Sequence, residues 1–273
     1  MNNNQTIIVM SDIHLTTGGN RIIGLDPVEK FKHALSHAIT KHKNVSHIVF
    51  TGDLSHNGVL EEYIILKDIL KDVEIPITFM MGNHDRRKEF CEVFPSVKLD
   101  DFGFLQSTIL YENHFLVCLD TLNSPSATNQ KHNGFLCQKR LLWLERQLED
   151  AGEKKVILFM HHPAFPVGFK AMDKIRLING DDFFCLLDRF KNIVHIICGH
   201  VHRNISGNFR GHAFSIFKST CHQMPLNFES NNVKLSAAET PAYGLLYLSQ
   251  TGVTVHSEEF ELTSDKKKVF QSY

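Results

Sequence analysis

The chain has 273 residues, of which 42% are hydrophobic, so it can bury a large core in one big domain or two small ones. Its formal net charge of -1 favours neither nucleic acid nor an anionic membrane as the main partner. No apolar run is long enough to span a bilayer, and the first residues lack the basic and apolar regions of a signal peptide, so we expect a cytoplasmic protein.

Strand and helix patterns alternate through most of the chain. Asp26 and Pro27 are typical of a helix start, with Asp as the N-cap and Pro in the first turn. Short apolar runs between the helical patterns indicate buried strands. The expected strands are 6–10, 47–50, 76–81, 115–119 with a hairpin partner at 108–111, 156–160 and 193–198, and the expected helices follow Asp26 and cover 60–70, 138–151 and a stretch near 181–190.

The C-terminal part changes character. Residues 213–217, 243–248 and 253–256 look like short strands joined by turns, and the cluster 265–268 looks like a solvated tail. The chain has no internal repeat and no linker rich in Pro, Gly or Ser. We therefore expect one α/β domain over residues 1–273, in which residues 205–273 complete the second sheet and form the tail.

The six cysteines are widely spaced and include no CxxC pair, which favours reduced thiols in a cytosolic protein over a disulfide framework or a cysteine metal site. They are Cys91, Cys118, Cys137, Cys185, Cys198 and Cys221.

Residues rich in Asp, Asn and His follow five of the expected strands. Sites in open α/β sheets form at the carboxyl ends of the strands. One such segment alone is common turn or cap chemistry, but five segments at five strand ends are hard to explain that way. They are Asp12-Ile13-His14, Gly52-Asp53, Gly82-Asn83-His84-Asp85, His161-His162-Pro163 and Gly199-His200-Val201-His202.

These residue types have a chemical reason to occur together. Mixed histidine and carboxylate donors suit Fe, Mn, Zn or Co and not Ca or Mg alone. Two metals roughly 3.5–4 Å apart need one bridging carboxylate, and they clamp the attacking and leaving oxygens of a displacement. Gly52, Gly82 and Gly199 would let the backbone turn sharply beside the ions. The sequence therefore predicts a two-metal phosphoesterase.

In this order the five segments resemble the calcineurin-like metallophosphoesterase superfamily over about residues 6–225. A closer likeness, to the bacterial class III cyclic-nucleotide phosphodiesterases and the related glycerophosphodiesterases, rests on HHPAFPVG at 161–168, on Met172-Asp173 and on STCHQ at 219–223. Ala164 departs from the more usual second proline, which we expect to alter a loop and not the chemistry. The resemblance implies a four-layer αββα sandwich of two mixed sheets flanked by helices, with the metals at one edge.

The resemblance also implies a role for each matching residue. His161 is assigned as a ligand in preference to His162 because the metal histidine of the family is the first of such a pair. His84 would contact the phosphate or the leaving group, and Asp85 would orient His84. The implied ligands are Asp12, His14 and His202 for the first metal, Asn83, His161 and His200 for the second, and Asp53 as the bridge.

The implied reaction is hydrolysis of a small phosphodiester by a hydroxide that bridges the metals. A 3′,5′-cyclic nucleotide such as cAMP is the first candidate substrate, and a glycerophosphodiester or a broad range of phosphoesters is the alternative. We expect no nucleic acid polymer or membrane as partner, and a homo-oligomer stays open. A catalytically silent metal-binding scaffold is the alternative from another class, disfavoured because every expected ligand and His84 are present.

Further polar residues near the motifs could contact the substrate. His56 and Asn57 follow Asp53 closely, and His222 lies within 219–223, although a turn role would also explain them. The loops 122–135 and 223–241 are polar and long enough to form a lid, a binding segment or a subunit contact. His195 interrupts an apolar strand and is expected to be a core or edge histidine.

Overall fold

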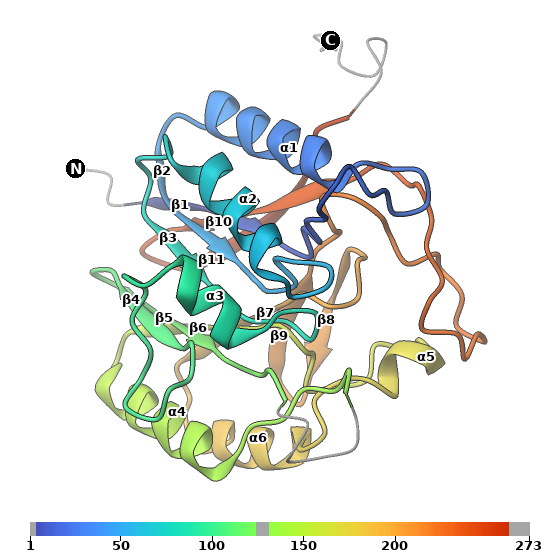
Figure 1. The fold of residues 1–273 in the computed structure, drawn as a ribbon. Coiled ribbons are helices and arrows are strands. Elements are labelled where there is room, and N and C mark those ends of the chain that lie inside the picture. Colours follow the sequence, from blue (N-terminus) through green and yellow to red (C-terminus); the bar gives the residue numbers. More distant parts are fainter. Residues whose placement is uncertain (1–3, 124–130, 262–273) are drawn as a thin grey trace, which may run out of the picture.

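Two β-sheets packed face to face form the centre of the molecule, and helices cover their outer faces (Figure 1). The computed structural model describes residues 4–123 and 131–261. The four-layer αββα sandwich implied by the sequence is confirmed. The outer helices are α1 (Pro27–Lys41) and α2 (Leu60–Leu70) on one side and α4 (Gln138–Asp150) and α6 (Gly180–Leu187) on the other.

Both sheets are mixed. In the five-stranded sheet β1, β2 and β3 are parallel and the two C-terminal strands are antiparallel to their neighbours. Its order is β11 (Val253–Glu259), β10 (Ala242–Leu248), β1 (Gln5–Met10), β2 (Val45–Phe50) and β3 (Ile77–Phe79). The six-stranded sheet has the order β4 (Ser107–Leu110), β5 (His114–Leu119), β6 (Lys155–Met160), β7 (Ile193–Cys198), β9 (His212–Ile216) and β8 (Ile205–Phe209), with β4 and β8 antiparallel to their neighbours.

Strand β1 serves two cores at once. Ile8 and Met10 belong to the core beneath α1 and α2, whereas Ile7 and Val9 belong to the core between the sheets. All four side chains are fully buried. Because successive side chains of a strand point to opposite faces, a strand covered on both faces needs a continuous apolar run, as the sequence has here.

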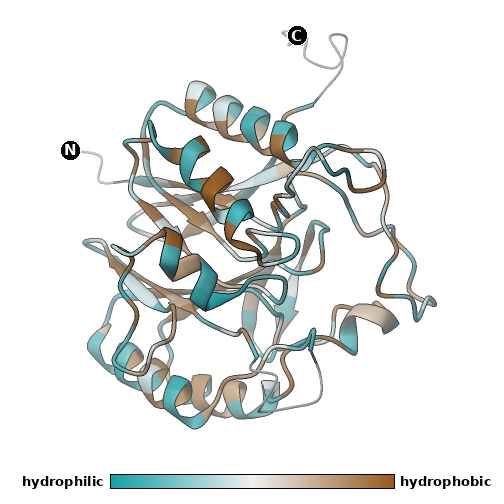
Figure 2. Cartoon of the chain, viewed as in Figure 1, coloured by the Kyte–Doolittle hydropathy of each residue, from teal (hydrophilic) through white to brown (hydrophobic). Residues whose placement is uncertain are grey.

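The first helix begins as its sequence predicts. The Asp26 carboxylate accepts hydrogen bonds from the backbone amides of Val28 at 3.0 Å and Glu29 at 3.1 Å, and Pro27 occupies the first turn. In Figure 2 the strands are mostly brown while α1 mixes teal and brown, as expected for a helix with one face on the core and one in water.

The C-terminal strands divide between the sheets. β8 and β9 extend the six-stranded sheet, but β10 pairs with β1 and carries β11 to the edge of the other sheet. The expectation that residues 205–273 complete the second sheet therefore holds only for β8 and β9, because local strand patterns do not say which sheet edge a strand joins. The expected tail at 265–268 lies outside the described residues.

Three short elements were not expected from the sequence. The two helices are too short to display a clear period and have no side-chain cap to mark their start, and β8 is interrupted by Ser, Gly and Asn in the sequence ISGNF. They are α3 (Arg87–Val93), α5 (Lys170–Asp173) and β8 (Ile205–Phe209).

All six cysteines are free, and Cys118, Cys198 and Cys221 are buried. Over residues 4–123 and 131–261, none of the helices combines the length and the apolar character needed to cross a membrane.

The strand ends that carry the motifs meet at one end of the sandwich. Parallel pairing brings the carboxyl ends of β1, β2 and β3 side by side, and does the same for β6 and β7. The two groups touch across the sheets, since the backbone amide of His200 donates to the carboxylate of Asp12 at 3.1 Å. The loops after these strands therefore share one place.

Candidate metal centre

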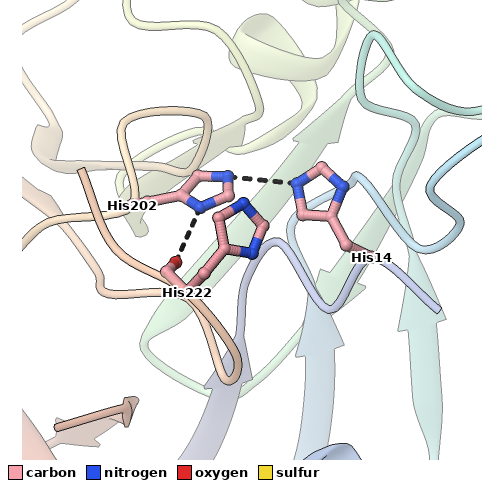
Figure 3. Close-up of side chains that lie close together, drawn as sticks. All are labelled: His14, His202 and His222. Carbon is pink, nitrogen blue, oxygen red and sulfur yellow. Dashed lines mark hydrogen bonds between the residues drawn. The ribbon is translucent and has the colours of Figure 1, made fainter. Parts of the chain in front are cut away.

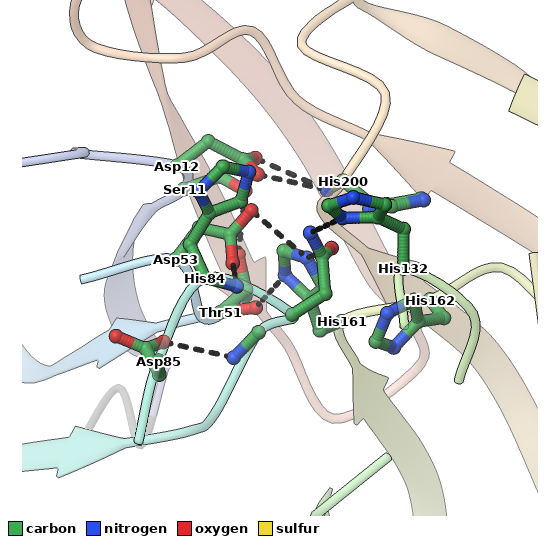
Figure 4. A network of polar contacts seen from close by, with 12 residues as sticks. Ser11, Asp12, Thr51, Asp53, His84, Asp85, His132, His161, His162 and His200 are labelled. Carbon is green, nitrogen blue, oxygen red and sulfur yellow. Dashed lines mark hydrogen bonds and ion pairs between the residues drawn. The ribbon is translucent and has the colours of Figure 1, made fainter. Parts of the chain in front are cut away.

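Four of the expected ligands converge from the loops after β1, β2, β6 and β7 in Figure 4, namely Asp12, Asp53, His161 and His200. One ligand atom from each of four side chains lies within 4.8 Å of the others, in the group Asp12, His14, Asp53 and His202. Nε2 of His202 is 3.1 Å from Nε2 of His14 and 3.3 Å from Oδ1 of Asp12. Nε2 of His14 is 3.6 Å from Oδ2 of Asp53. These are the residues expected for the first metal together with the bridge.

The second group meets at the other side of Asp53. Nε2 of His161 lies 3.4 Å from Oδ2 of Asp53 and 3.3 Å from Oδ1 of Asn83. The rings of His161 and His200 are 5.1 Å apart. The same carboxylate oxygen of Asp53 thus faces both His14 and His161, which is the placement that a bridging ligand requires.

Backbone carbonyls fix which ring nitrogen of each histidine is free. A carbonyl only accepts, so the nitrogen facing it carries the hydrogen and leaves the other nitrogen with a lone pair. Nδ1 of His161 donates to the carbonyl of Thr51 at 2.9 Å, Nδ1 of His202 to that of His222 at 2.9 Å, and Nε2 of His200 to that of Ile175 at 3.1 Å.

These contacts make the site fit a pair of cations. Figure 3 shows the two contacts of the His202 ring, one with the carbonyl of His222 and one with the ring of His14. Lone pairs from His161 and His202 point into a buried cluster that also holds the carboxylates of Asp12 and Asp53, and all of these residues are buried or nearly so. Nitrogen and carboxylate donors of this kind suit transition metals, and uncompensated they would be unfavourable in the interior.

His162 occupies a different position from His161. Its Nδ1 pairs with Oγ1 of Thr121 at 2.8 Å, and its ring is fully buried. His161 instead has Nε2 beside Asp53. One ligand nitrogen of each of His161, His162 and His200 lies within 4.8 Å of the others, so the assignment of His161 rather than His162 as the ligand stays a prediction.

The pKa shifts match these ligand states. Burial lowers the pKa of His200 to about 3, and burial followed by the charge of His84 puts the pKa of His14 well below its ordinary value, so both rings are neutral. Burial also opposes the charged form of His161, but the charge of Asp53 and its hydrogen bond raise the pKa of His161 to about 9. A position that holds a proton so firmly also attracts a metal cation.

The backbone is strained at the ligands. A positive φ is unusual in residues other than glycine, and such residues persist only where the surroundings hold them. It occurs in five of the seven expected ligands, namely Asp12 (53°), His14 (46°), Asp53 (49°), His200 (72°) and His202 (51°).

The three glycines of the motifs are needed for different reasons. Gly52 has φ +104°, a conformation that residues with a side chain rarely adopt. Gly82 and Gly199 have no positive φ; a Cβ on Gly82 would collide with Asp53, and one on Gly199 would lie 2.5 Å from Oγ of Ser11. The expected sharp turn therefore describes Gly52, whereas the other two permit close approach of the chain.

His84 lies beside the ligands without joining either group of close donors around Asp53. Its backbone amide donates to Oδ1 of Asp53 at 2.8 Å, and its Nδ1 donates to the carbonyl of His56 at 2.7 Å. The His84 and His14 rings are 4.7 Å apart. The side chain is thus fixed, with Nε2 left as the nitrogen available to a substrate.

Asp85 has a structural environment of its own. Its carboxylate accepts from the backbone amides of Leu54 at 3.2 Å, Ser55 at 3.1 Å and Gly82 at 2.9 Å, and from the hydroxyl of Tyr63 at 3.1 Å. These bonds join the loop after β2 to the loop after β3. Asp85 therefore holds the backbone around Asp53 and His84, and its role in orienting His84 stays a prediction.

A cavity of about 290 Å³ opens over the ligands. His56 and His222 line it, as does His84. Asn57 does not line it; its side-chain amide donates to Oε1 of Glu62 at 2.9 Å, so the structure gives Asn57 a role in holding its loop.

The sequence reading did not single out several residues of the cavity. One is His132, from the loop 122–135, whose Nδ1 lies 3.3 Å from Nδ2 of Asn83. The sequence indicates only the loops 122–135 and 223–241 as possible binding segments, because which of their side chains line the cavity depends on how distant loops meet. The others are Ile22, Ile175, Met224, Val233, Lys234, Leu235 and Ser236, and Met172, quoted above for the closer likeness, also lines the cavity.

Comparisons with known proteins identify the family and the fold. The family model described as calcineurin-like phosphoesterase matches residues 5–204. A probable cyclic nucleotide phosphodiesterase of Rhodopseudomonas palustris is 36% identical over 254 residues, which cover 93% of this chain and 92% of that protein. A probable glycerophosphodiester phosphodiesterase of Arcobacter nitrofigilis is 28% identical, with 92% of each chain covered. A dimetal phosphatase from Danio rerio has a similar fold, with a TM-score of 0.71 at 15% identity over 94% of this chain and 96% of that chain.

Proposed function

This chain belongs to the calcineurin-like phosphoesterase family and is a metal-dependent hydrolase of phosphodiesters, and on that premise we propose that it cleaves 3′,5′-cyclic AMP at a two-metal centre. The observation that carries the proposal is the position of Asp53. Its Oδ2 lies 3.6 Å from Nε2 of His14 and 3.4 Å from Nε2 of His161, so one carboxylate serves two sets of donors. A single metal would leave one of these sets without a cation.

The proposed ligand sets follow from these distances. When bound, the two metals would activate water at neutral pH and neutralise charge on the phosphoryl oxygens. The donor set suits Fe, Mn, Zn or Co and does not choose among them. The proposed ligands are Asp12, His14 and His202 for one metal, Asn83, His161 and His200 for the other, and Asp53 shared by both.

His84 is the proposed acid for the departing oxygen. Its Nδ1–H is engaged by the carbonyl of His56, so only Nε2 is free to face the cavity. In its doubly protonated form the ring can donate from Nε2 to the leaving alkoxide, a role that suits histidine near neutral pH. Asp85 acts as a positioning residue through the backbone amides it accepts. His56 and His222 are proposed to contact the substrate from the cavity wall.

A glycerophosphodiester is the second candidate substrate. It is supported by the relative in Arcobacter nitrofigilis, whose name states that activity and which covers nearly the whole chain. The same donors would act on either diester, because the reacting phosphate is alike in both.

A substrate panel on metal-reconstituted protein tests the proposal. The panel compares the kcat/KM values of 3′,5′-cyclic AMP, 2′,3′-cyclic AMP, glycerophosphocholine, the monoester p-nitrophenyl phosphate and the diester bis(p-nitrophenyl) phosphate. The highest value for 3′,5′-cyclic AMP is expected. A preference for glycerophosphocholine would establish the second candidate, and a preference for the monoester would sink the diester assignment.

A metal titration separates the enzyme from a silent scaffold. Two equivalents of metal are expected per chain, measured by elemental analysis after supplementation with Mn, Co, Zn or Fe. Two bound equivalents without turnover of any ester would support the scaffold, and a single equivalent would contradict the two-metal centre.

A further inference from the structure

The cavity above the ligands has a second side that is apolar. Five side chains from two separate segments line it, and we refer to them as the apolar wall. Two of them are almost fully buried, whereas Val233 is 36% exposed. The apolar wall consists of Met172, Ile175, Met224, Val233 and Leu235.

The loop that carries three of the five residues of the apolar wall is closed at its base. Gln223 and Ala237 exchange backbone hydrogen bonds of 2.9 and 2.8 Å, which pins the two ends of the intervening segment together. The amide of Met224 donates to the carbonyl of His202 at 3.2 Å. The apolar wall is thereby attached directly to the loop of a proposed metal ligand.

The tip of the same loop is held by the residues on either side of α5, and this segment, 169–175, supplies the rest of the wall. Figure 1 shows the orange segment running down to α5. The rings of Phe228 and Phe169 are 5.3 Å apart, and Nζ of Lys174 donates to Oδ1 of Asn231 at 2.6 Å. With both base and tip fixed, Val233 and Leu235 are presented to the cavity by a preorganised loop.

The chemistry of the wall restricts what can bind beside the phosphate. A polyol such as glycerol would leave these apolar side chains without a partner, and a long acyl chain does not fit into about 290 Å³. A planar heteroaromatic ring fits, because thioethers such as those of Met172 and Met224 make favourable contacts with aromatic rings. Lys234 adds positive charge to the lining, which suits a ligand that also carries a phosphate.

We propose that the apolar wall binds the base of a nucleotide diester and so makes the site selective for diesters that carry a base. The inference rests on the proposed function, since it names the part of the substrate that the same cavity recognises. Catalytic groups on one side and a base-binding surface on the other would place the sugar between them.

Two ligands that differ only in the base test the proposal by binding and not by turnover. AMP and ribose 5-phosphate carry the same phosphate on the same sugar. In calorimetric titrations of the metal-loaded protein, AMP is expected to bind at least roughly 10-fold more tightly. Equal affinities would overturn the proposal.

Matched substitutions locate the effect on the wall. Leu235→Asn and Val233→Asn are each expected to weaken AMP binding roughly 10-fold and to leave ribose 5-phosphate binding unchanged. The control is Leu226→Asn, the same substitution on the same loop at a side chain that is 59% exposed and does not line the cavity. Equal losses for both ligands, or an equal effect of Leu226→Asn, would refute the assignment.

Two further measurements keep the test decisive. Thermal unfolding and metal content identify a variant that is misfolded. If Leu235→Asn is misfolded, the proposal is tested with Val233→Asn, because Val233 is more exposed. Hydrolysis of 3′,5′-cyclic AMP is measured in parallel. A base preference without hydrolysis would refute the proposed function alone, and hydrolysis without a base preference would refute the wall alone.

Discussion

The backbone amide of His84 donates a hydrogen bond of 2.8 Å to Oδ1 of Asp53. The residue proposed to protonate the leaving group is therefore fixed to the carboxylate proposed to join the two metals. Because Oδ2 of Asp53 faces His14 and His161, the carboxylate has one oxygen for the loop and one for the cations. The position of the acid relative to the metals is thus set by the backbone.

Replacing His84 with Ala is expected to lower kcat by about 10²–10⁴ while metal content stays at the wild-type level, because a general acid is lost and no ligand is removed. Steady-state kinetics and elemental analysis on the same samples measure both. A diester with a good leaving group, such as a p-nitrophenyl ester, should be less affected because it needs little protonation. Full activity of the variant would exclude His84 from the mechanism.

Replacing Asp53 with Asn is expected to reduce bound metal below two equivalents and to lower kcat/KM at least about 100-fold. The amide is similar in shape but lacks the negative charge that two cations share. Asp101→Asn is the matched control, since Asp101 is exposed and does not line the cavity. If Asp53→Asn retained both metals at wild-type affinity, the bridging role would be contradicted.

Removing the metals with a chelator is expected to abolish hydrolysis and lower the Tm. A ligand that binds only the folded state at 100 times its Kd stabilises it by about 2.7 kcal/mol. In the metal-free protein, the Nε2 atoms of His161 and His202 lie beside the carboxylates of Asp53 and Asp12 in a buried cluster, and no metal joins them. Scanning calorimetry before and after back-titration measures the shift. An unchanged Tm after metal removal would argue against a buried metal site.

Replacing Asp85 with Ala is expected to destabilise the fold by about 3 kcal/mol or more, because several buried donors lose their acceptor at once. The donors include the amides of Leu54, Ser55 and Gly82. Urea unfolding gives the free energy. Ser55→Ala, which removes one hydroxyl donor to Asp85 and keeps the Ser55 backbone amide, should lose much less. A small loss for Asp85→Ala would show that these loops hold together without it.

Replacing His195 with Val is expected to flatten the acid side of the stability profile. Burial lowers the pKa of His195 to about 4, from an ordinary 6.5 that the unfolded chain retains. As pH falls below about 6.5 the unfolded state takes up a proton that the folded state resists, so wild-type stability present above that pH is lost on the way to pH 4.

The size of this effect can be measured by difference. Between about pH 8 and pH 5 the wild type should lose roughly 2 kcal/mol more than the valine variant, with urea unfolding at both values as the measurement. The other histidines contribute equally to the pH dependence of both proteins, so their contributions cancel in the difference. Nε2 of His195 is 3.0 Å from Oγ of Ser215, and loss of that contact shifts the variant equally at both pH values. Parallel profiles would contradict a neutral buried His195.

Strand and helix positions were largely predictable because local patterns specify them. Ile7 to Met10 form an apolar run buried on both faces, and Asp26 with Pro27 marks the start of α1. The pairing of β10 with β1 was not predictable, since an edge is chosen by contacts across about 240 residues of sequence. Elements as short as α5 leave no period to detect.

By itself the sequence determined the types and the order of the candidate ligands, because a dinuclear site needs particular donor atoms at the ends of particular strands. Only the tertiary structure decided that Oδ2 of Asp53 faces both His14 and His161, and that Asn57 turns to Glu62. It also brought Leu235 to the same cavity as the ligands. The reason is physical: donor chemistry belongs to single residues, whereas distances between loops arise only when the sheets pack.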